Sequence, residues 1–189
     1  RQMCIRDSCK MAELAAILCS CGKMECFSGD TKLKIQTENE AVARKCFTLL
    51  QKTFNIETKI FVRENSHLKR VKVYTIEITD PEEIQVIFQA LRLVTNSIDQ
   101  GTLVLSDMLV VQQNCCKRAF IRGAFLASGS ISDPEKGYHF EIVCSDAKRA
   151  EQLQTIIRSF SVDAKIVQRK KSHVVYVKDC LLYTSPSPR

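Results

Sequence analysis

Two nine-residue stretches decide the fold: LAAILCSCG at residues 14–22 and IRGAFLASG at residues 121–129. In the first, apolar side chains recur at helical spacing before Gly22, and glycine commonly ends a helix. An offset of 107 residues superposes the two stretches, and it also pairs Cys9 and Lys10 with Cys116 and Lys117. The chain therefore contains an internal repeat.

The same periodicity recurs through both copies. The first copy predicts a helix at 10–22, a strand at 31–36, a helix from Thr37 or Glu38 to 54, and strands at 56–63 and 71–78. The second predicts a helix at 115–128, a strand at 138–143, a helix at 146–160 opened by Ser145 or Asp146, and strands at 163–169 and 173–178. We also expect a short strand after Gly22 and after Gly129, and a helix at 81–91. The predicted fold class is α+β, with the order αββαββ in each copy.

Both helix ends resemble the LAGLIDADG motif of homing endonucleases. A core helix that happens to contain small residues is the alternative, but the motif opens an αββαββ unit twice. The resemblance implies a duplicated, pseudo-twofold αββαββ(α) fold whose two motif helices pack closely through small side chains. The residues expected at this helix pair are Ala15, Ala16, Ser20, Gly22, Gly123, Ala124, Ala127 and Gly129.

The sequence around the motifs is more specific. Four segments closely resemble the WhiA family of bacterial sporulation and cell-division regulators. They are CKMAELAAILCSCG at 9–22, QTENEAVARK at 36–45, CCKRAFIRGAFLASGSISDPEKGYHFEIV at 115–143 and KIVQRKKSHVVYVKD at 165–179. In that family a degenerate LAGLIDADG-type domain precedes a carboxy-terminal helix-turn-helix domain. The resemblance implies a fragment that lacks the second domain and whose second repeat is truncated.

Both ends of the chain have unusual composition. Residues 1–8 (RQMCIRDS) and 180–189 (CLLYTSPSPR) resemble translated sequencing-adapter sequence, and we expect them to be non-native tails. The expected organisation between them is repeat 1 at 9–92, a linker at 93–114 and repeat 2 at 115–179.

The motif positions that matter for catalysis carry no acid. In LAGLIDADG nucleases the penultimate motif residue is an acid that binds Mg²⁺ at the cleavage centre, and hard cations prefer carboxylate oxygens. The matching residues here are Cys21 and Ser128. Glu25 and Asp133 lie beyond the helix ends, at places that are not equivalent in the two copies. The resemblance therefore implies a protein that is not an enzyme and has no catalytic residue.

Composition excludes several other classes. The 189 residues carry 28 Lys and Arg against 21 Asp and Glu, a net charge of +7. No apolar run approaches the roughly 18 residues of a membrane span, and no signal peptide is visible. The ten cysteines lack zinc-finger spacing: Cys19 and Cys21 point to opposite faces of a helix, and the neighbours Cys115 and Cys116 diverge. We expect a cytoplasmic, nucleoid-associated protein without metal or cofactor.

DNA binding is the function that remains. Basic residues outnumber acidic ones in both repeats, whereas acidic ones prevail in the segment 81–114. We expect salt-dependent phosphate contacts from basic side chains on the strands and hairpins. The candidates are Lys32, Lys34, Lys59, Arg63, Lys69, Arg70, Lys72, Lys165, Arg169, Lys170 and Lys171.

The family resemblance gives this prediction its biological setting. It implies a non-catalytic, double-stranded-DNA-binding domain of a WhiA-like transcription regulator in sporulation, cell division and chromosome segregation. The domain is expected to be a monomeric pseudo-dimer with a possible protein partner. A protein-interaction or regulatory scaffold and an active LAGLIDADG homing endonuclease are the alternatives.

Overall fold

The computed structural model describes residues 7–27, 29–65, 71–96, 101–131 and 139–178. The chain divides into two compact units, residues 1–127 and 128–189, and each is described by itself. The boundary lies at the end of the helix α4 (Asn114–Ser128), inside the segment that the sequence assigns to the second repeat. The expected repeat and linker limits stay a prediction.

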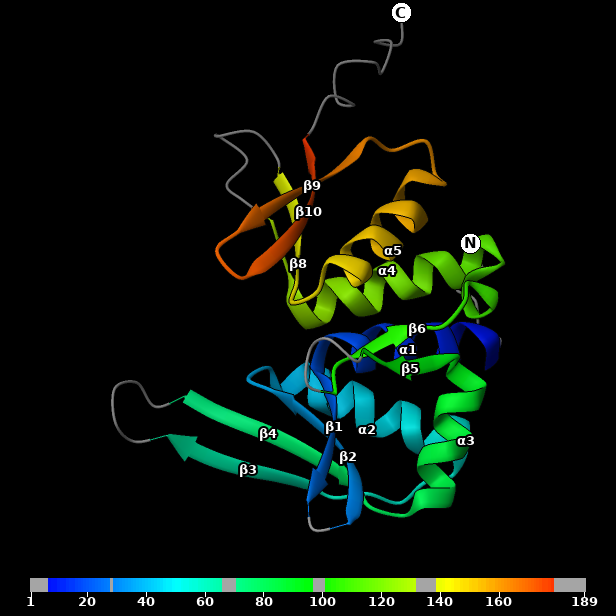
Figure 1. Cartoon of the computed structure of the whole chain (residues 1–189), viewed down its shortest axis with the longest axis vertical. Coiled ribbons are helices and arrows are strands. Elements are labelled where there is room, and N and C mark those ends of the chain that lie inside the picture. Colours follow the sequence, from blue (N-terminus) through cyan, green and yellow to red (C-terminus); the bar gives the residue numbers. More distant parts are fainter. Residues whose placement is uncertain (1–6, 28, 66–70, 97–100, 132–138, 179–189) are drawn as a thin grey trace, which may run out of the picture. The chain divides into compact units, whose positions relative to one another are not determined.

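The first unit begins with the αββαββ order that the periodicity predicts (Figure 1). Its elements are α1 (Asp7–Cys21), β1 (Gly22–Phe27), β2 (Asp30–Thr37), α2 (Glu40–Phe54), β3 (Ile60–Asn65), β4 (Val71–Ile78) and α3 (Pro81–Leu91). The four strands form an antiparallel sheet in the order β1-β2-β4-β3. The short strand expected after Gly22 is therefore confirmed as β1.

The core of this unit lies between the sheet and its helices. Leu33 and Ile35 of β2 are buried and pair across the sheet with Ile78 and Ile76 of β4, so these apolar side chains share one face. Lys32 and Lys34, which alternate with them along the strand, share the opposite face. α1 is buried along most of its length, from Ala12 to Cys19. It is the central helix of the unit.

The start of α2 differs from the prediction by one or two residues. The helix was expected to open at Thr37 or Glu38, but its N-cap is Asn39, whose side chain accepts a hydrogen bond from the Ala41 N–H at 2.9 Å. Thr37 remains the last residue of β2, and its hydroxyl oxygen accepts a hydrogen bond from the Asn39 N–H. The asparagine caps the helix because its carbonyl oxygen satisfies a free backbone donor.

The segment expected to be a linker is ordered where the structure describes it. It forms an antiparallel hairpin of β5 (Leu93–Thr95) and β6 (Leu103–Leu105), and then a short 3₁₀ helix η1 (Leu109–Val111). All three residues of β6 are buried. Gly101, at a φ of 81°, accepts a hydrogen bond from the Met24 N–H at 2.8 Å, and a Cβ at this glycine would collide with the Met24 backbone oxygen. The hairpin thus extends the core past β1.

The second unit repeats the arrangement that follows α1. β7 (Gly129–Ile131), β8 (His139–Cys144), α5 (Ala147–Arg158), β9 (Ala164–Arg169) and β10 (Ser172–Lys178) form an antiparallel sheet in the order β7-β8-β10-β9, with α5 packed against three of its strands. Asp146 caps α5 by accepting from the backbone N–H of Lys148 and Arg149, which confirms one of the two predicted caps. The α+β prediction and the element order of each copy are confirmed. The expected truncation of the second repeat concerns residues outside the described ranges.

Candidate nucleic-acid interface

The two motif helices, α1 and α4, meet at Gly123. A Cβ built on Gly123 would lie 2.5 Å from the backbone oxygen of Glu13 and 3.1 Å from the Cβ of Ala16. Real Cβ atoms essentially never approach a backbone atom so closely. Glycine is therefore required at this position of α4 because the backbone of α1 occupies the space of a side chain.

The other small residues occupy several environments. Ala15, Ala16 and Ala124 are buried, whereas Ser20, Ala127 and Gly129 are partly exposed. The Ser20 hydroxyl donates to the Ala16 carbonyl of its own helix at 3.0 Å. A Cβ at Gly22 would meet the Leu18 backbone oxygen and the Leu103 side chain of β6. For these residues, unlike Gly123 and Ala16, contact across the helix pair stays a prediction.

A buried carboxylate ties the same two helices together. Glu13 of α1 has a side chain only 4% exposed, and it accepts hydrogen bonds from Arg122 of α4, from Nε at 3.1 Å and from Nη2 at 2.9 Å. Lys45 of α2 places its ammonium nitrogen 3.4 Å from the same carboxylate. Glu13 was not among the predicted site residues. The only signal was an acid inside an otherwise apolar helical segment.

The residues that stand where the nucleases have their acids are the last residues of the two motif helices. Cys21 is the last residue of α1 and Ser128 is the last residue of α4. Burial raises the pKa of the Cys46 thiol in α2 far above its ordinary value, and the neighbouring Cys21 adds to this rise. Cys21 thus adjoins a neutral buried thiol. Glu13 lies eight residues earlier on α1, about 12 Å along the helix axis, and is not placed to substitute for an acid there.

Glu25, one of the two acids considered as substitutes, is bound by lysines. Its carboxylate lies 3.3 Å from Lys34 Nζ and 3.6 Å from Lys32 Nζ, across β1 and β2. Partial burial favours the protonated form, but the hydrogen bonds and charges of Lys34 and Lys32 outweigh it and lower the pKa of Glu25 from its ordinary value. Asp133, the other acid, lies outside the described residues.

Lys32 and Lys72 of the first sheet are also paired with acids, on opposite faces of the sheet. Lys32 also donates to Glu77 of β4 at 3.1 Å, and this hydrogen bond raises the pKa of the lysine. Lys72, nearer the β3–β4 turn, lies 3.7 Å from Glu64. These predicted phosphate ligands are therefore already paired with acids. Lys69 and Arg70 lie outside the described residues.

Beside the ion pairs of Lys34 and Glu77 on the first sheet lies a shallow pocket lined by basic and aromatic side chains. Phe61, which is 53% exposed, and Arg63 of β3 line it together with Lys34, Gln36 and Glu77. Within the described ranges, no acidic side chain forms an ion pair with Arg63, with Lys59 just before β3, or with the exposed Lys23 of β1. Lys23 was not among the predicted ligands, although it follows Gly22 on the strand expected there.

The second sheet shows the same mixture. Arg169 of β9 makes two 3.1 Å hydrogen bonds to Glu141 of β8, and Lys165 lies 3.4 Å from Asp163. Lys170 and Lys171 form the exposed turn between β9 and β10, and Lys170 adopts a φ of 54°. Among the described residues, neither turn lysine is paired with an acid. Among the described residues of this unit, the turn therefore presents two adjacent lysines without an acidic partner.

Two family models match the chain in tandem. The WhiA N-terminal LAGLIDADG-like domain matches residues 7–94, and the WhiA LAGLIDADG-like domain matches residues 117–181. The chain belongs to the WhiA family. This confirms the family resemblance drawn from the motif-bearing segments.

WhiA relatives from bacteria match along nearly the whole chain. The protein of Lachnoclostridium phytofermentans is 49% identical over 180 residues, which cover 95% of this chain and 58% of the relative. That of Alkaliphilus oremlandii is 38% identical over 176 residues, covering 90% and 54% respectively. Both are named probable cell division protein WhiA. The chain thus spans little more than half the length of these relatives.

Solved structures share the fold at low sequence identity. Full-length DUF199/WhiA from Thermotoga maritima matches with a TM-score of 0.64 and 17% identity, over 93% of this chain and 52% of that one. I-DmoI in complex with DNA and Mn matches with a TM-score of 0.61 and 13% identity, over 91% and 90%. I-DmoI is a homing endonuclease. The predicted LAGLIDADG homing-endonuclease-like fold is therefore confirmed.

Within the described residues, every helix is too short or too polar to span a bilayer.

Proposed function

We propose that this chain is a non-catalytic, double-stranded-DNA-binding domain of a WhiA-like transcription regulator in sporulation, cell division and chromosome segregation. It would act in the cytoplasm at the nucleoid, as a monomeric pseudo-dimer of repeats 9–92 and 115–179 joined by 93–114. The observation that carries this proposal is the combination of a fold shared with DNA-bound I-DmoI and the residues Cys21 and Ser128 at the two acid positions.

The lack of an acid at these positions argues against strand cleavage. Metal-assisted hydrolysis of a phosphodiester needs carboxylates to hold Mg²⁺ beside the scissile phosphate. The thiol of Cys21 and the hydroxyl of Ser128 supply no carboxylate oxygen to hold the cation. Glu25 does not replace them, because Lys32 and Lys34 bind its carboxylate. The domain would therefore bind duplex DNA without cutting it.

Phosphate contact would rest on the basic side chains that, within the described residues, form no ion pair with an acid. Arg63 and Lys59 offer such charge beside the first sheet, and Lys170 and Lys171 offer it at the β9–β10 turn. Lys32, Lys34, Lys72, Lys165 and Arg169 would contribute less, because each already forms an ion pair. We therefore expect weak, salt-sensitive binding with little sequence preference from this chain.

One feature favours a protein-interaction scaffold as the second candidate function. On the second sheet, Val143 of β8 and Val167 of β9 are 41% and 36% exposed. Both are register partners of Val174 in the intervening strand β10, which is buried, so an apolar stripe that is exposed only at its two outer valines crosses the sheet. Such an apolar stripe fits a protein surface better than a phosphate backbone.

Salt dependence separates the two functions. Binding of a labelled duplex, measured by gel shift at several salt concentrations, should give a logarithmic affinity that falls with slope about −0.9 for each phosphate contact. The double variant Arg63→Ala/Lys171→Ala should bind more weakly and make this slope shallower by about 1 to 2. Both changes remove phosphate ligands.

The matched control removes two equal charges from exposed helix positions, Lys52→Ala in α2 with Lys148→Ala in α5. This variant should keep the slope of the unmodified chain. A slope near zero for the unmodified chain, or equal losses in the two double variants, would contradict direct phosphate contact and favour the scaffold.

A further inference from the structure

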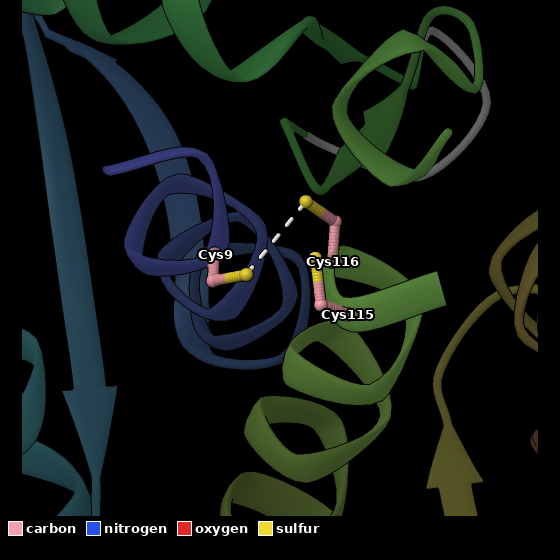
Figure 2. A group of neighbouring side chains, drawn as sticks. All are labelled: Cys9, Cys115 and Cys116. Carbon is pink, nitrogen blue, oxygen red and sulfur yellow. Dashed lines mark hydrogen bonds between the residues drawn. The ribbon is translucent and has the colours of Figure 1, made fainter. Parts of the chain in front are cut away.

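Three thiols meet where the motif helices begin. Cys9 lies in the first turn of α1, and Cys115 and Cys116 lie in the first turn of α4 (Figure 2). All three Sγ atoms lie within 4.8 Å of one another, and those of Cys9 and Cys116 are 3.8 Å apart. Cys9 and Cys116 are buried, whereas Cys115 is partly exposed. The cluster belongs entirely to the first unit.

Sequence spacing did not find this cluster. We expected no metal from Cys115 and Cys116 because neighbouring helical residues point apart, but their sulfur atoms both lie near Cys9. Spacing rules compare cysteines that are close in the chain. The third thiol comes from the other copy, 107 residues away, at the position equivalent to Cys116. The 107-residue repeat pairs Cys9 with Cys116 in the sequence, and it was therefore the signal that could have predicted this cluster.

The sulfur separations suit a thiophilic metal ion. A tetrahedral zinc site with Zn–S bonds of 2.3 Å places its sulfur atoms about 3.8 Å apart. The Cys9–Cys116 separation has this length, and the Cys115 sulfur lies within 4.8 Å of both. We propose that Cys9, Cys115 and Cys116 form a three-thiolate site for a zinc-class cation.

The surroundings favour negative charge at this position. The first turns of α1 and α4 supply backbone N–H groups and the positive ends of two helix dipoles, which stabilise anionic ligands. Binding of one divalent cation forms three metal–sulfur bonds and releases three thiol protons, so that the resulting group carries a single negative charge. Helix ends of this kind offset part of that charge.

A pocket gives solvent access to one of the three thiols. It is lined by Cys116 together with Ser8 and Met11 of α1, Gln113 and residues of α3 and η1. The Gln113 side-chain oxygen also accepts from the Cys115 thiol at 3.5 Å. Water entering this pocket would complete a tetrahedral site, since zinc bound by three protein ligands commonly keeps a solvent ligand.

Metal binding would join the two repeats at the ends of their motif helices. A ligand that binds only the folded chain stabilises it by mass action, and thiolate sites release protons as they load. The site is independent of the proposed DNA binding. Its loss would leave the sheets and their basic residues unchanged.

Titration with Zn²⁺ and with Cd²⁺ tests the proposal. The reduced, metal-free chain should carry Cys4→Ser and Cys180→Ser, so that only thiols of described residues remain. We expect one equivalent of Cd²⁺ to produce a thiolate-to-metal absorption band, Zn²⁺ to displace it, and Zn²⁺ to raise the thermal unfolding midpoint. Cys9→Ser, Cys115→Ser and Cys116→Ser should each lower the Zn²⁺ affinity at least tenfold.

Two further serine variants serve as controls. Cys26→Ser in β1 and Cys144→Ser in β8 remove an exposed and a buried thiol outside the cluster, and should bind Zn²⁺ like the parent. Circular dichroism without metal shows whether each variant folds, and Cys115→Ser should keep the fold because its side chain is partly exposed. An absent Cd²⁺ band in the parent, or equal loss of affinity in Cys26→Ser and Cys115→Ser, would overturn the site.

Discussion

Replacing Gly123 with alanine is expected to destabilise the chain by about 2 kcal/mol, although alanine is the better helix former. Helix propensity alone predicts a gain of about 1 kcal/mol. The added Cβ, however, would lie 2.5 Å from the Glu13 backbone oxygen, which cannot turn away as a flexible side chain would. Urea unfolding followed by circular dichroism measures the change in the free energy of unfolding. The sign of this change alone decides whether helix propensity or the steric clash of the added Cβ dominates.

The control for this variant is Leu126→Ala, in the same helix at a side chain that is 41% exposed. It should change the free energy of unfolding by less than about 1 kcal/mol, since little packing is lost at an exposed site. If Gly123→Ala proves as stable as the parent or more stable, the close approach of α1 and α4 is contradicted. The motif helices would then not pack through their small residues.

Removing the two cations that contact the buried Glu13 carboxylate should lower the free energy of unfolding by as much as Gly123→Ala does, or by more. The double variant Arg122→Ala/Lys45→Ala leaves Glu13 charged, 4% exposed and without its two partners. We expect a loss of about 3 kcal/mol in the free energy of unfolding, because an uncompensated buried charge costs more than the ion pair contributes. Urea unfolding at neutral pH measures this loss.

Adding Glu13→Gln to that variant provides the sharper comparison. The amide removes the charge while keeping the shape, so the triple variant should recover at least half of the lost stability. Lys52→Ala/Lys148→Ala, which removes two positive charges from exposed positions, should have little effect. Equal stability of the double and triple variants would show that Glu13 is not held as a buried charge.

Much of the fold follows from periodicity in the sequence. Strand alternation places Leu33 and Ile35 on the buried face, and the 107-residue offset identifies the second copy without further information. The β5–β6 hairpin was not predicted, because each strand has three residues, too few to show a period. Its burial depends on the edge of β1 and on Gly101, a tertiary contact that local sequence does not contain.

The candidate site was less predictable than the fold. Basic residue types could be placed on strands, but the pairing of Lys32 with Glu77 and of Arg169 with Glu141 depends on strand register. Similarly, Glu13 and Arg122 lie 109 residues apart, and only the packing of α1 on α4 brings them together. Alternation predicts the face on which a side chain lies. It does not predict the partner that the side chain finds across that face.

One incubation tests most directly the claim that the domain binds duplex DNA without cutting it. A labelled duplex is mixed with the chain and Mg²⁺ at low salt, and the same sample is run on a native and on a denaturing gel beside a metal-chelated control. We predict a retarded complex on the native gel and full-length strands on the denaturing gel, with or without metal. Mg²⁺-dependent cleavage products, or no retarded complex at any protein concentration, would contradict the account.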